Sequence, residues 1–196
     1  MSQLPLFAST GDIVVADDQL GRITYTSDVV PPDVADAWFL EMRDAVPWKT
    51  QRRRMYDRDV DVPRLMASFR LPVEDNHAPD VVRAAAGKVA AVTGVPFNSV
   101  GLNFYRDGRD SVAPHTDLDD IVHGSPVALL SLGATRRMDI RTKEPPKRAL
   151  HLDLAGGSLL VMSYDTQLHY THAISKTRDA VGARISLAFR VKPPGG

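Results

Sequence analysis

The sequence predicts a mainly β protein of the α+β class, in which short strands build a sandwich or a barrel. The first observation is that the second half of the chain consists of strand-like segments separated by turns. We expect these strands at residues 99–105, 128–132, 137–141, 149–153, 158–162, 169–174 and 184–191. Short strands at regular spacing are typical of a sandwich or barrel. The second observation is that two helical patterns precede the series, and the second of them is expected only to brace a sheet.

The two helical patterns have recognisable ends. The first helix is expected to open at Pro31-Pro32-Asp33 and to run to about Ala45, because proline and an acidic residue are favoured in a first helical turn. The second is expected from about Pro79 to Thr93, followed by Gly94, which fits the left-handed position after a helix. Apolar residues of the second helix recur with the spacing of one buried face, at Val82, Ala85, Ala86, Val89 and Val92. Short strands are expected near 12–16 and 21–26.

The amino-acid composition limits the kinds of active site and metal site that the chain can form. A chain of 196 residues with 43% hydrophobic residues is expected to form one domain with a sizeable core. The sequence has no cysteine, which excludes disulfides, thiol nucleophiles and cysteine-bound zinc, so a metal must be held by His, Asp or Glu. Without a long apolar run or a signal-peptide pattern, the protein is expected to be soluble and cytoplasmic.

The net charge is zero, so no overall positive field argues for nucleic acid. Basic residues nevertheless gather in two places. The first group is Lys49, Arg52, Arg53, Arg54 and Arg58, and the second is Arg136, Arg137, Arg141, Lys143, Lys147 and Arg148. Either group could neutralise phosphates. The alternative is that each is a solvated charged surface, and acidic residues interrupt the first group.

A candidate metal site begins with His115 and Asp117. Side chains two apart on a strand point to the same face, so an imidazole and a carboxylate would lie side by side. Two histidines and one carboxylate around a non-haem Fe(II) leave positions open for a co-substrate and O2. The third ligand must be a later histidine, and His169 and His172 are candidates whose odd spacing would turn them to opposite strand faces.

A candidate anion site lies near the end of the chain. Arg184 and Arg190 are six residues apart, so on a strand both guanidinium groups face one way. Apolar side chains alternate with them at Ile185, Leu187 and Phe189, which leaves the arginines on a small and polar face. A buried pair of cations needs an anion, and the planar guanidinium suits a carboxylate such as either end of 2-oxoglutarate.

The ordered set of these motifs resembles the AlkB family of Fe(II)- and 2-oxoglutarate-dependent dioxygenases. The set comprises Asn103-x-Tyr105, His115-x-Asp117, a distant histidine and Arg184-x5-Arg190, with Gly157-Ser-Leu-Leu-Val-Met before the distant histidine. The resemblance covers about residues 103–190. It implies a double-stranded β-helix, or jelly roll, that holds Fe(II) and uses 2-oxoglutarate and O2 as co-substrates. The register of the family pattern selects His172 as the third metal ligand.

The resemblance also implies roles around the co-substrate. Arg184 would bind the distal carboxylate of 2-oxoglutarate, and Arg190 would lie near the carboxylate that chelates iron. Asn103 and Tyr105 would add hydrogen bonds. Between the arginines the chain departs from many members of the family, with Ser186 where asparagine is common and Ala188 where threonine is common.

By the same resemblance, residues from about 1 to 97 would form an extension, supporting helices and a substrate-recognition lid, and about 98–193 the catalytic core of a single domain. Trp48 and Tyr56 could stack on a flipped base, and core packing is the alternative for each. Asp119, one strand step beyond Asp117, would contact the base, unless it caps its own backbone. Arg141 would reach the substrate side.

The resemblance implies oxidative demethylation of nucleobases such as 1-methyladenine and 3-methylcytosine, in which 2-oxoglutarate gives succinate and CO2 and the methyl group leaves as formaldehyde. The expected partner is single-stranded or locally opened DNA, or RNA, and we expect a monomer with no membrane association. Two alternatives remain at this stage. One is a 2-oxoglutarate-dependent hydroxylase of a protein or small molecule, and the other a non-catalytic jelly-roll module whose metal is closed off by a fourth protein ligand.

Overall fold

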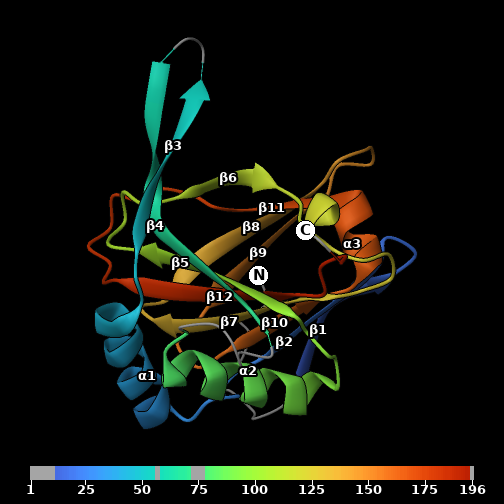
Figure 1. The fold of residues 1–196 in the computed structure, drawn as a ribbon. Coiled ribbons are helices and arrows are strands. Elements are labelled where there is room, and N and C mark those ends of the chain that lie inside the picture. The colour runs from blue at the N-terminus through green and yellow to red at the C-terminus, as the bar shows by residue number, and fades with distance from the viewer. Residues whose placement is uncertain (1–11, 56–57, 72–77, 195–196) are drawn as a thin grey trace.

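Two β-sheets form the body of the protein. The computed structural model describes residues 12–55, 58–71 and 78–194, and between residues 51 and 61 it describes only the backbone. The major sheet has the strand order β1-β2-β10-β7-β12-β5-β4-β3, and the minor sheet has the order β6-β11-β8-β9. Figure 1 shows the minor sheet lying across one face of the major sheet, with helices α1 and α2 on the opposite face. The predicted β class with helices packed on a sheet is confirmed.

Most element bounds lie within one or two residues of the predicted ones. The strands of the major sheet are β1 (Asp12–Asp18), β2 (Gly21–Thr26), β3 (Lys49–Met55), β4 (Arg58–Arg70), β5 (Ser99–Tyr105), β7 (Val127–Gly133), β10 (Leu159–Met162) and β12 (Arg184–Arg190). Those of the minor sheet are β6 (Val112–His115), β8 (Arg136–Thr142), β9 (Ala149–Leu154) and β11 (Tyr170–Ile174). The helices are α1 (Pro32–Ala45), α2 (Asp80–Thr93), α3 (Tyr164–His169) and the short 3-10 helix η1 (Leu118–Asp120).

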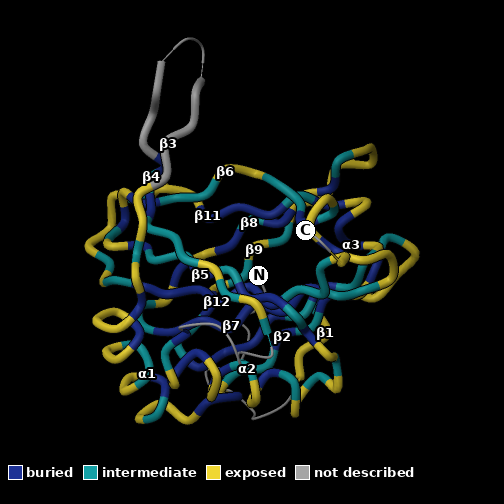
Figure 2. The backbone as a smooth tube through the Cα atoms, in the orientation of Figure 1, coloured by how far each residue is buried: buried dark blue, intermediate teal, exposed yellow. Residues whose placement is uncertain are grey.

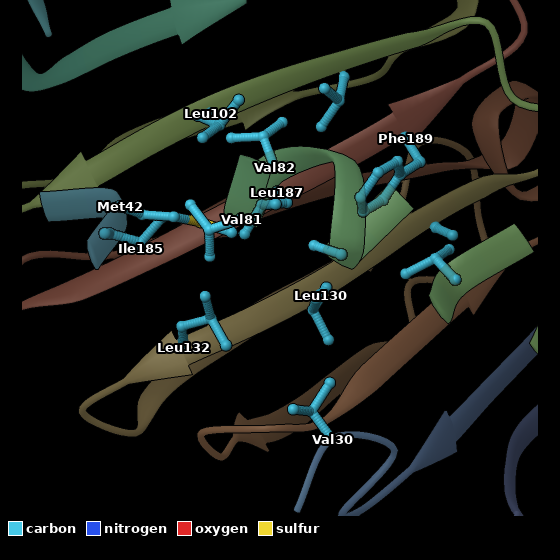
Figure 3. Close-up of a cluster of buried hydrophobic side chains, with 14 of the residues drawn as sticks. Val30, Met42, Val81, Val82, Leu102, Leu130, Leu132, Ile185, Leu187 and Phe189 are labelled. Atoms are coloured by element: carbon cyan, nitrogen blue, oxygen red, sulfur yellow. The ribbon is translucent and has the colours of Figure 1, made fainter. Parts of the chain in front are cut away.

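Alternation along β12 explains how the major sheet separates a core from a site. Ile185, Leu187 and Phe189 are buried in a cluster that includes residues of α1 and α2. Figure 3 shows these three side chains with Met42 of α1 and Val82 of α2, and burying such side chains contributes about 1.5–3 kcal/mol each. The opposite face of β12 therefore lies between the two sheets.

The helices end as the sequence predicted. α2 is followed by Gly94 with a φ of 68°, and the Gly94 N–H donates to the carbonyl of Ala90, as in a left-handed helix cap. Its buried face contains Val81, Val82, Ala85 and Val89, whereas Val92 is exposed. Figure 2 shows that the buried backbone is concentrated in the strands, while the outer sides of α1 and α2 are largely exposed.

Strands β3 and β4 pair in antiparallel fashion and extend away from the body of the molecule (Figure 1). β4 then continues into the major sheet, where residues Leu65 to Arg70 pair with β5. The role of this hairpin as a substrate-recognition lid stays a prediction. Among the described residues, no helix is both long and apolar enough to cross a membrane.

Two local expectations were wrong. The strand expected from His169 begins at Tyr170, because residues 164–169 form helix α3, which the sequence analysis did not predict. The strand that carries His115 ends at that residue, so Asp117 and Asp119 do not continue it. Asp119 belongs to η1 and is therefore not one strand step beyond Asp117.

Candidate metal centre and co-substrate cavity

Three side chains, two of them close in sequence and one distant, converge between the sheets. His115 at the end of β6 pairs directly with His172 of β11, and their ring centroids are 4.3 Å apart. Asp117 follows two residues after β6, and its Oδ2 lies 3.5 Å from His172 Nε2. One ligand atom from each of the three residues lies within 4.8 Å of those of the other two. The predicted set of His115, Asp117 and His172 is therefore brought together.

The histidines are prepared to present Nε2 to a metal. His115 Nδ1 lies 2.9 Å from the carbonyl oxygen of Ala113, which only accepts, so Nδ1 carries the proton and Nε2 is free to act as a ligand. Burial lowers the pKa of His172 to about 4, although the carboxylate of Asp117 acts in the opposite direction. His172 is therefore neutral at physiological pH, as a metal ligand must be.

Asp117 is held at one oxygen and open at the other. Its Oδ1 accepts from Arg190 Nε at 3.0 Å and from Arg190 Nη2 at 2.6 Å. Burial raises the pKa of Asp117, but the positive charge and the hydrogen bonds of Arg190 oppose it, and the pKa lies below its usual value. Among the described residues, Oδ2 is buried without a hydrogen-bond partner. Because unpartnered buried carboxylate oxygens are costly, this arrangement fits a cation, and two imidazoles with one carboxylate fit Fe(II).

The side chain of Arg190 passes close to Gly101, which has no side chain, on its way to Asp117. A Cβ added to Gly101 on β5 would lie 3.0 Å from Arg190 Nη1. Arg190 was expected near the carboxylate that chelates iron, and the structure places its guanidinium on the metal-ligating carboxylate itself. A contact of Arg190 with the co-substrate stays a prediction.

Arg184 lies at the other end of the site. It is 1% exposed, and its Nη2 donates to Ser131 Oγ at 2.9 Å. Within the described part of the chain, its Nε and Nη1 have no hydrogen-bond partner, and burial lowers its pKa. A buried guanidinium with free donors fits a carboxylate, which accepts two parallel N–H bonds. Arg184 is thus suited to the role predicted for it.

Tyr105 lies between two cations. The guanidinium of Arg184 is 5.3 Å from its ring centroid and that of Arg136 is 5.8 Å away. Arg136 was only counted among basic residues in the sequence, but it is buried and donates to the carbonyls of Asp107, Asp110 and Ser175. It therefore ties the loop before β6 to the residue after β11, next to the strands that carry the two histidines.

Arg64, a residue that was not predicted from the sequence, lies beside Asn103. Arg64 on β4 is 9% exposed, and its Nε donates to Asn103 Oδ1 at 2.6 Å while Nη1 donates to the carbonyl of Ser111 at 3.2 Å. The contact fixes the amide of Asn103. Arg64 and Ser68 lie an even number of residues apart on β4, with Leu65, Ala67 and Phe69 at the alternate positions, and this spacing is the sequence signal for Arg64 on the site face.

Apart from Arg136, the side chains that form the site line one cavity of about 1150 Å³ between the sheets. Its walls include all three residues of the metal set and every residue predicted to bind the co-substrate, namely Asn103, Tyr105, Arg184 and Arg190. Ser186 and Ala188, where the chain departs from many AlkB members, lie on the same wall between the arginines.

The residues predicted to bind the substrate are more scattered. Asp119 is exposed and lines the cavity near the metal set. Arg141 is exposed on β8, beside Thr171 of β11, and is not among the residues that line the cavity. Trp48 packs on Phe104 with ring centroids 5.2 Å apart, and its Nε1 donates to the carbonyl of Arg43. This favours core packing for Trp48, and Tyr56 lies outside the described residues.

Comparison with known proteins agrees with this geometry. The family model described as the 2OG-Fe(II) oxygenase superfamily matches residues 22–190. The alpha-ketoglutarate-dependent dioxygenase alkB homolog 3 of Homo sapiens is 33% identical over 83% of this chain and 64% of its own length. The corresponding protein of Bos taurus is 30% identical over 93% of this chain and 70% of its own length. The DNA oxidative demethylase ALKBH2 of Bos taurus is 36% identical over 56% of this chain and 42% of its own length.

The chain thus spans less than two thirds of the length of several curated relatives. Among solved structures, the non-heme alpha ketoglutarate dependent epimerase SnoN from nogalamycin biosynthesis superposes with a TM-score of 0.61 over 88% of this chain and 81% of its own, at 13% identity. That likeness concerns the fold alone. The metal set, the buried arginine and these matches lead to one conclusion: the chain belongs to the 2OG-Fe(II) oxygenase superfamily and, within it, to the AlkB homologues.

Proposed function

We propose that this protein is an Fe(II)- and 2-oxoglutarate-dependent dioxygenase that removes N-linked alkyl groups from nucleobases by oxidation. The observation that carries the proposal is that one cavity contains the metal set and, at another place, nitrogens of Arg184 that are buried without a hydrogen-bond partner among the described residues. Such a cavity is suited to a dicarboxylate that bridges a metal and a guanidinium.

The residues of the chain have distinct tasks in this reaction. His115 Nε2, His172 Nε2 and Asp117 Oδ2 would hold Fe(II) and leave positions open for 2-oxoglutarate and O2. Arg184 would bind the distal carboxylate of 2-oxoglutarate through Nε and Nη1. Asn103, held by Arg64, and Tyr105 would fix the rest of the co-substrate. The protein therefore supplies binding and orientation, while the metal and co-substrate supply the oxidising power.

When bound, the metal and 2-oxoglutarate place one oxygen atom of O2 in succinate, with loss of CO2, and the other in a hydroxyl group on the alkyl carbon. For an N-methyl group the product is an N-hydroxymethyl base. Its hydroxyl proton moves to the nitrogen as the carbon–nitrogen bond breaks, which releases formaldehyde and the unmodified base. The chain needs only to keep this alkyl carbon beside the open positions of the metal and to exclude other groups.

Nucleic acid is the proposed substrate because of two observations. One relative is named a DNA oxidative demethylase. The cavity also carries Asp119 on its wall, where a carboxylate could accept a hydrogen bond from an exocyclic amine of adenine or cytosine. The paired strands β3 and β4 beside the cavity would form the recognition lid, and they contain the residues of the first basic group.

The test supplies Fe(II), 2-oxoglutarate and O2 with oligonucleotides that contain 1-methyladenine, 3-methylcytosine or an etheno base, in DNA and in RNA. We expect formaldehyde and unmodified base from the methylated oligonucleotides, with succinate formed in equal amount. H172A is expected to abolish both products, and H169A, three residues away on the exposed end of α3, to retain them. Succinate without repaired base from any oligonucleotide would point instead to a hydroxylase of a protein or small molecule.

Binding provides a separate discriminator. Binding of single-stranded DNA to a nucleic-acid enzyme is expected to weaken steeply with salt, because each phosphate contact releases counterions. Binding that is absent, or that does not change with salt, would count against nucleic acid as the substrate. A metal that is bound tightly but supports no succinate formation at all would indicate the non-catalytic module.

A further inference from the structure

Helix α3 connects the metal centre to the first strands of the chain. We propose that Gln167 on α3 is a positioning residue for the metal ligand Asp117, and that strands β1 and β2 support the centre through it. The inference concerns metal binding and does not depend on which substrate is oxidised.

The contact between Gln167 and Asp117 is direct and buried. Gln167 is 1% exposed, and its Oε1 accepts the backbone N–H of Asp117 at 3.0 Å. Asp117 lies after the end of β6, so its backbone has no strand partner among the described residues, although its carbonyl accepts from the N–H of Asp120 at 2.9 Å. The side chain of Gln167 takes the place of that partner, fifty residues away in sequence. Since Arg190 holds the carboxylate and Gln167 holds the backbone, Asp117 is fixed at both ends.

Gln167 is itself fixed from several sides. Its Nε2 lies 3.9 Å from the sulfur of Met162 on β10. Its backbone carbonyl accepts from Lys143 Nζ at 2.8 Å, and the Lys143 N–H donates to the carbonyl of His169 at the end of the same helix. A buried amide held in this way has little freedom to follow a displaced Asp117, so it orients the ligand.

The first strands hold the start of α3. Ser163, which precedes the helix, exchanges two hydrogen bonds with Arg22 of β2: Arg22 N–H donates to Ser163 Oγ at 2.9 Å, and Ser163 N–H donates to the Arg22 carbonyl at 2.9 Å. Beside it, Gly21 has a φ of +122°, and a Cβ there would lie only 2.6 Å from the backbone nitrogen of Thr166. The hairpin of β1 and β2 thus packs against the helix so closely that only glycine fits.

These contacts give residues 12–26 a task that their sequence did not indicate. Gly21 and Arg22 contact Ser163 and Thr166 at the start of α3. Gln167 follows on the same helix and binds the backbone of Asp117. Residues that orient a metal ligand commonly change metal affinity by about 10- to 100-fold when they are replaced. The same size of effect is expected here, without any contact between Gln167 and the metal.

The test measures Mn(II) binding to the full chain, from the electron paramagnetic resonance signal of free Mn(II), together with thermal unfolding of the metal-free protein. Q167M keeps the volume but removes the acceptor, and we expect it to bind Mn(II) about 10- to 100-fold more weakly. Q167E keeps an oxygen at the same place and is expected to bind within about threefold of wild type. L168A, at an exposed neighbour on α3, serves as the control and is expected to match wild type.

G21A tests the longer connection. The added Cβ must displace the start of α3, so we expect weaker Mn(II) binding than in wild type even though Gly21 does not line the cavity. If Q167M is less stable yet binds Mn(II) as wild type does, Gln167 only fills the core and the proposal is overturned. Equal losses in Q167M and Q167E would also overturn it, because the acceptor would not matter. If G21A does not fold, the two Gln167 variants still decide the positioning role.

Discussion

Arg190 donates two hydrogen bonds to Oδ1 of Asp117 and leaves Oδ2 turned toward His172. A single carboxylate is thereby divided into an oxygen held by the protein and an oxygen available to a metal. The arrangement explains how a buried carboxylate stays ionised and in place before any cation binds.

Two replacements of Arg190 should distinguish how its positive charge and its planar guanidinium each contribute to stability. R190M leaves the Asp117 carboxylate buried without its cation, which is expected to lower the free energy of unfolding of the metal-free protein by about 3 kcal/mol. R190K keeps the charge but lacks the planar fork, so its loss should be smaller. Urea unfolding of the metal-free proteins measures both. Equal stability of wild type and R190M would mean that the pair contributes nothing to the fold.

The free energy of unfolding should decrease as the pH is lowered, because of His172. Its pKa is about 4 in the folded protein against 6.5 in the unfolded chain, so the unfolded chain takes up a proton first as the pH falls. The contribution of His172 is fully present above pH 6.5 and is lost as the pH falls from 6.5 to 4. A difference of this size corresponds to about 3 kcal/mol in the metal-free protein.

The measurement is urea unfolding of metal-free wild type and H172Q between pH 4 and 7. H172Q has no ionisable group at this position, so its stability should change less over that range. Identical pH dependence in the two proteins would assign the effect to other groups.

Arg184 is expected to bind 2-oxoglutarate but to contribute nothing to, or to lower, the stability of the metal-free protein. R184M removes a buried guanidinium whose Nε and Nη1 have no partner among the described residues, so the metal-free protein should be as stable as wild type or more stable. The same variant should bind 2-oxoglutarate at least about tenfold more weakly, since a hydrogen bond to a charged group contributes about 1.5–3 kcal/mol. Calorimetric titration with 2-oxoglutarate and thermal unfolding report the two effects. S131A, which removes only the serine hydroxyl that accepts from Arg184, is the milder control.

Trp48 offers a test of core packing against base stacking. W48A should lower the free energy of unfolding by about 3 kcal/mol, because it removes the contact with Phe104 and the core below it. W48F keeps much of that contact and should leave the KM for a methylated oligonucleotide unchanged. A raised KM in W48F with unchanged stability would show that the indole binds the base.

Much of the site could be predicted because its residues follow short sequence rules. The two-residue spacing of His115 and Asp117, and the alternation of β12 around Arg184, are visible in the sequence. The structure places these three residues around one cavity. The contacts that hold them were not visible. Gln167 and Arg64 act across 50 and 39 residues, on elements whose approach depends on how the sheets pack.

Local errors have physical causes too. Helix α3 is only six residues long, too short for an apolar periodicity, although Ser163 at its start is a favoured N-cap residue. The expectation for Asp119 extends a strand that in the structure ends at His115, and Asp119 lies in η1. Alternation with a period of two predicts the direction of a side chain only within a strand. Asp117 and Asp119 lie beyond the end of the strand, in a turn, where the alternation no longer holds.

The most direct test of the metal centre is an anaerobic titration of the metal-free protein with Fe(II) in the presence of 2-oxoglutarate, followed by the weak visible absorption of their chelate. We expect the band to saturate at one Fe(II) per chain in wild type and in H169A, and to be absent in D117A and H172A. A band of wild-type strength in D117A, or no band in folded wild type, would contradict the assignment of His115, Asp117 and His172 as the site of iron.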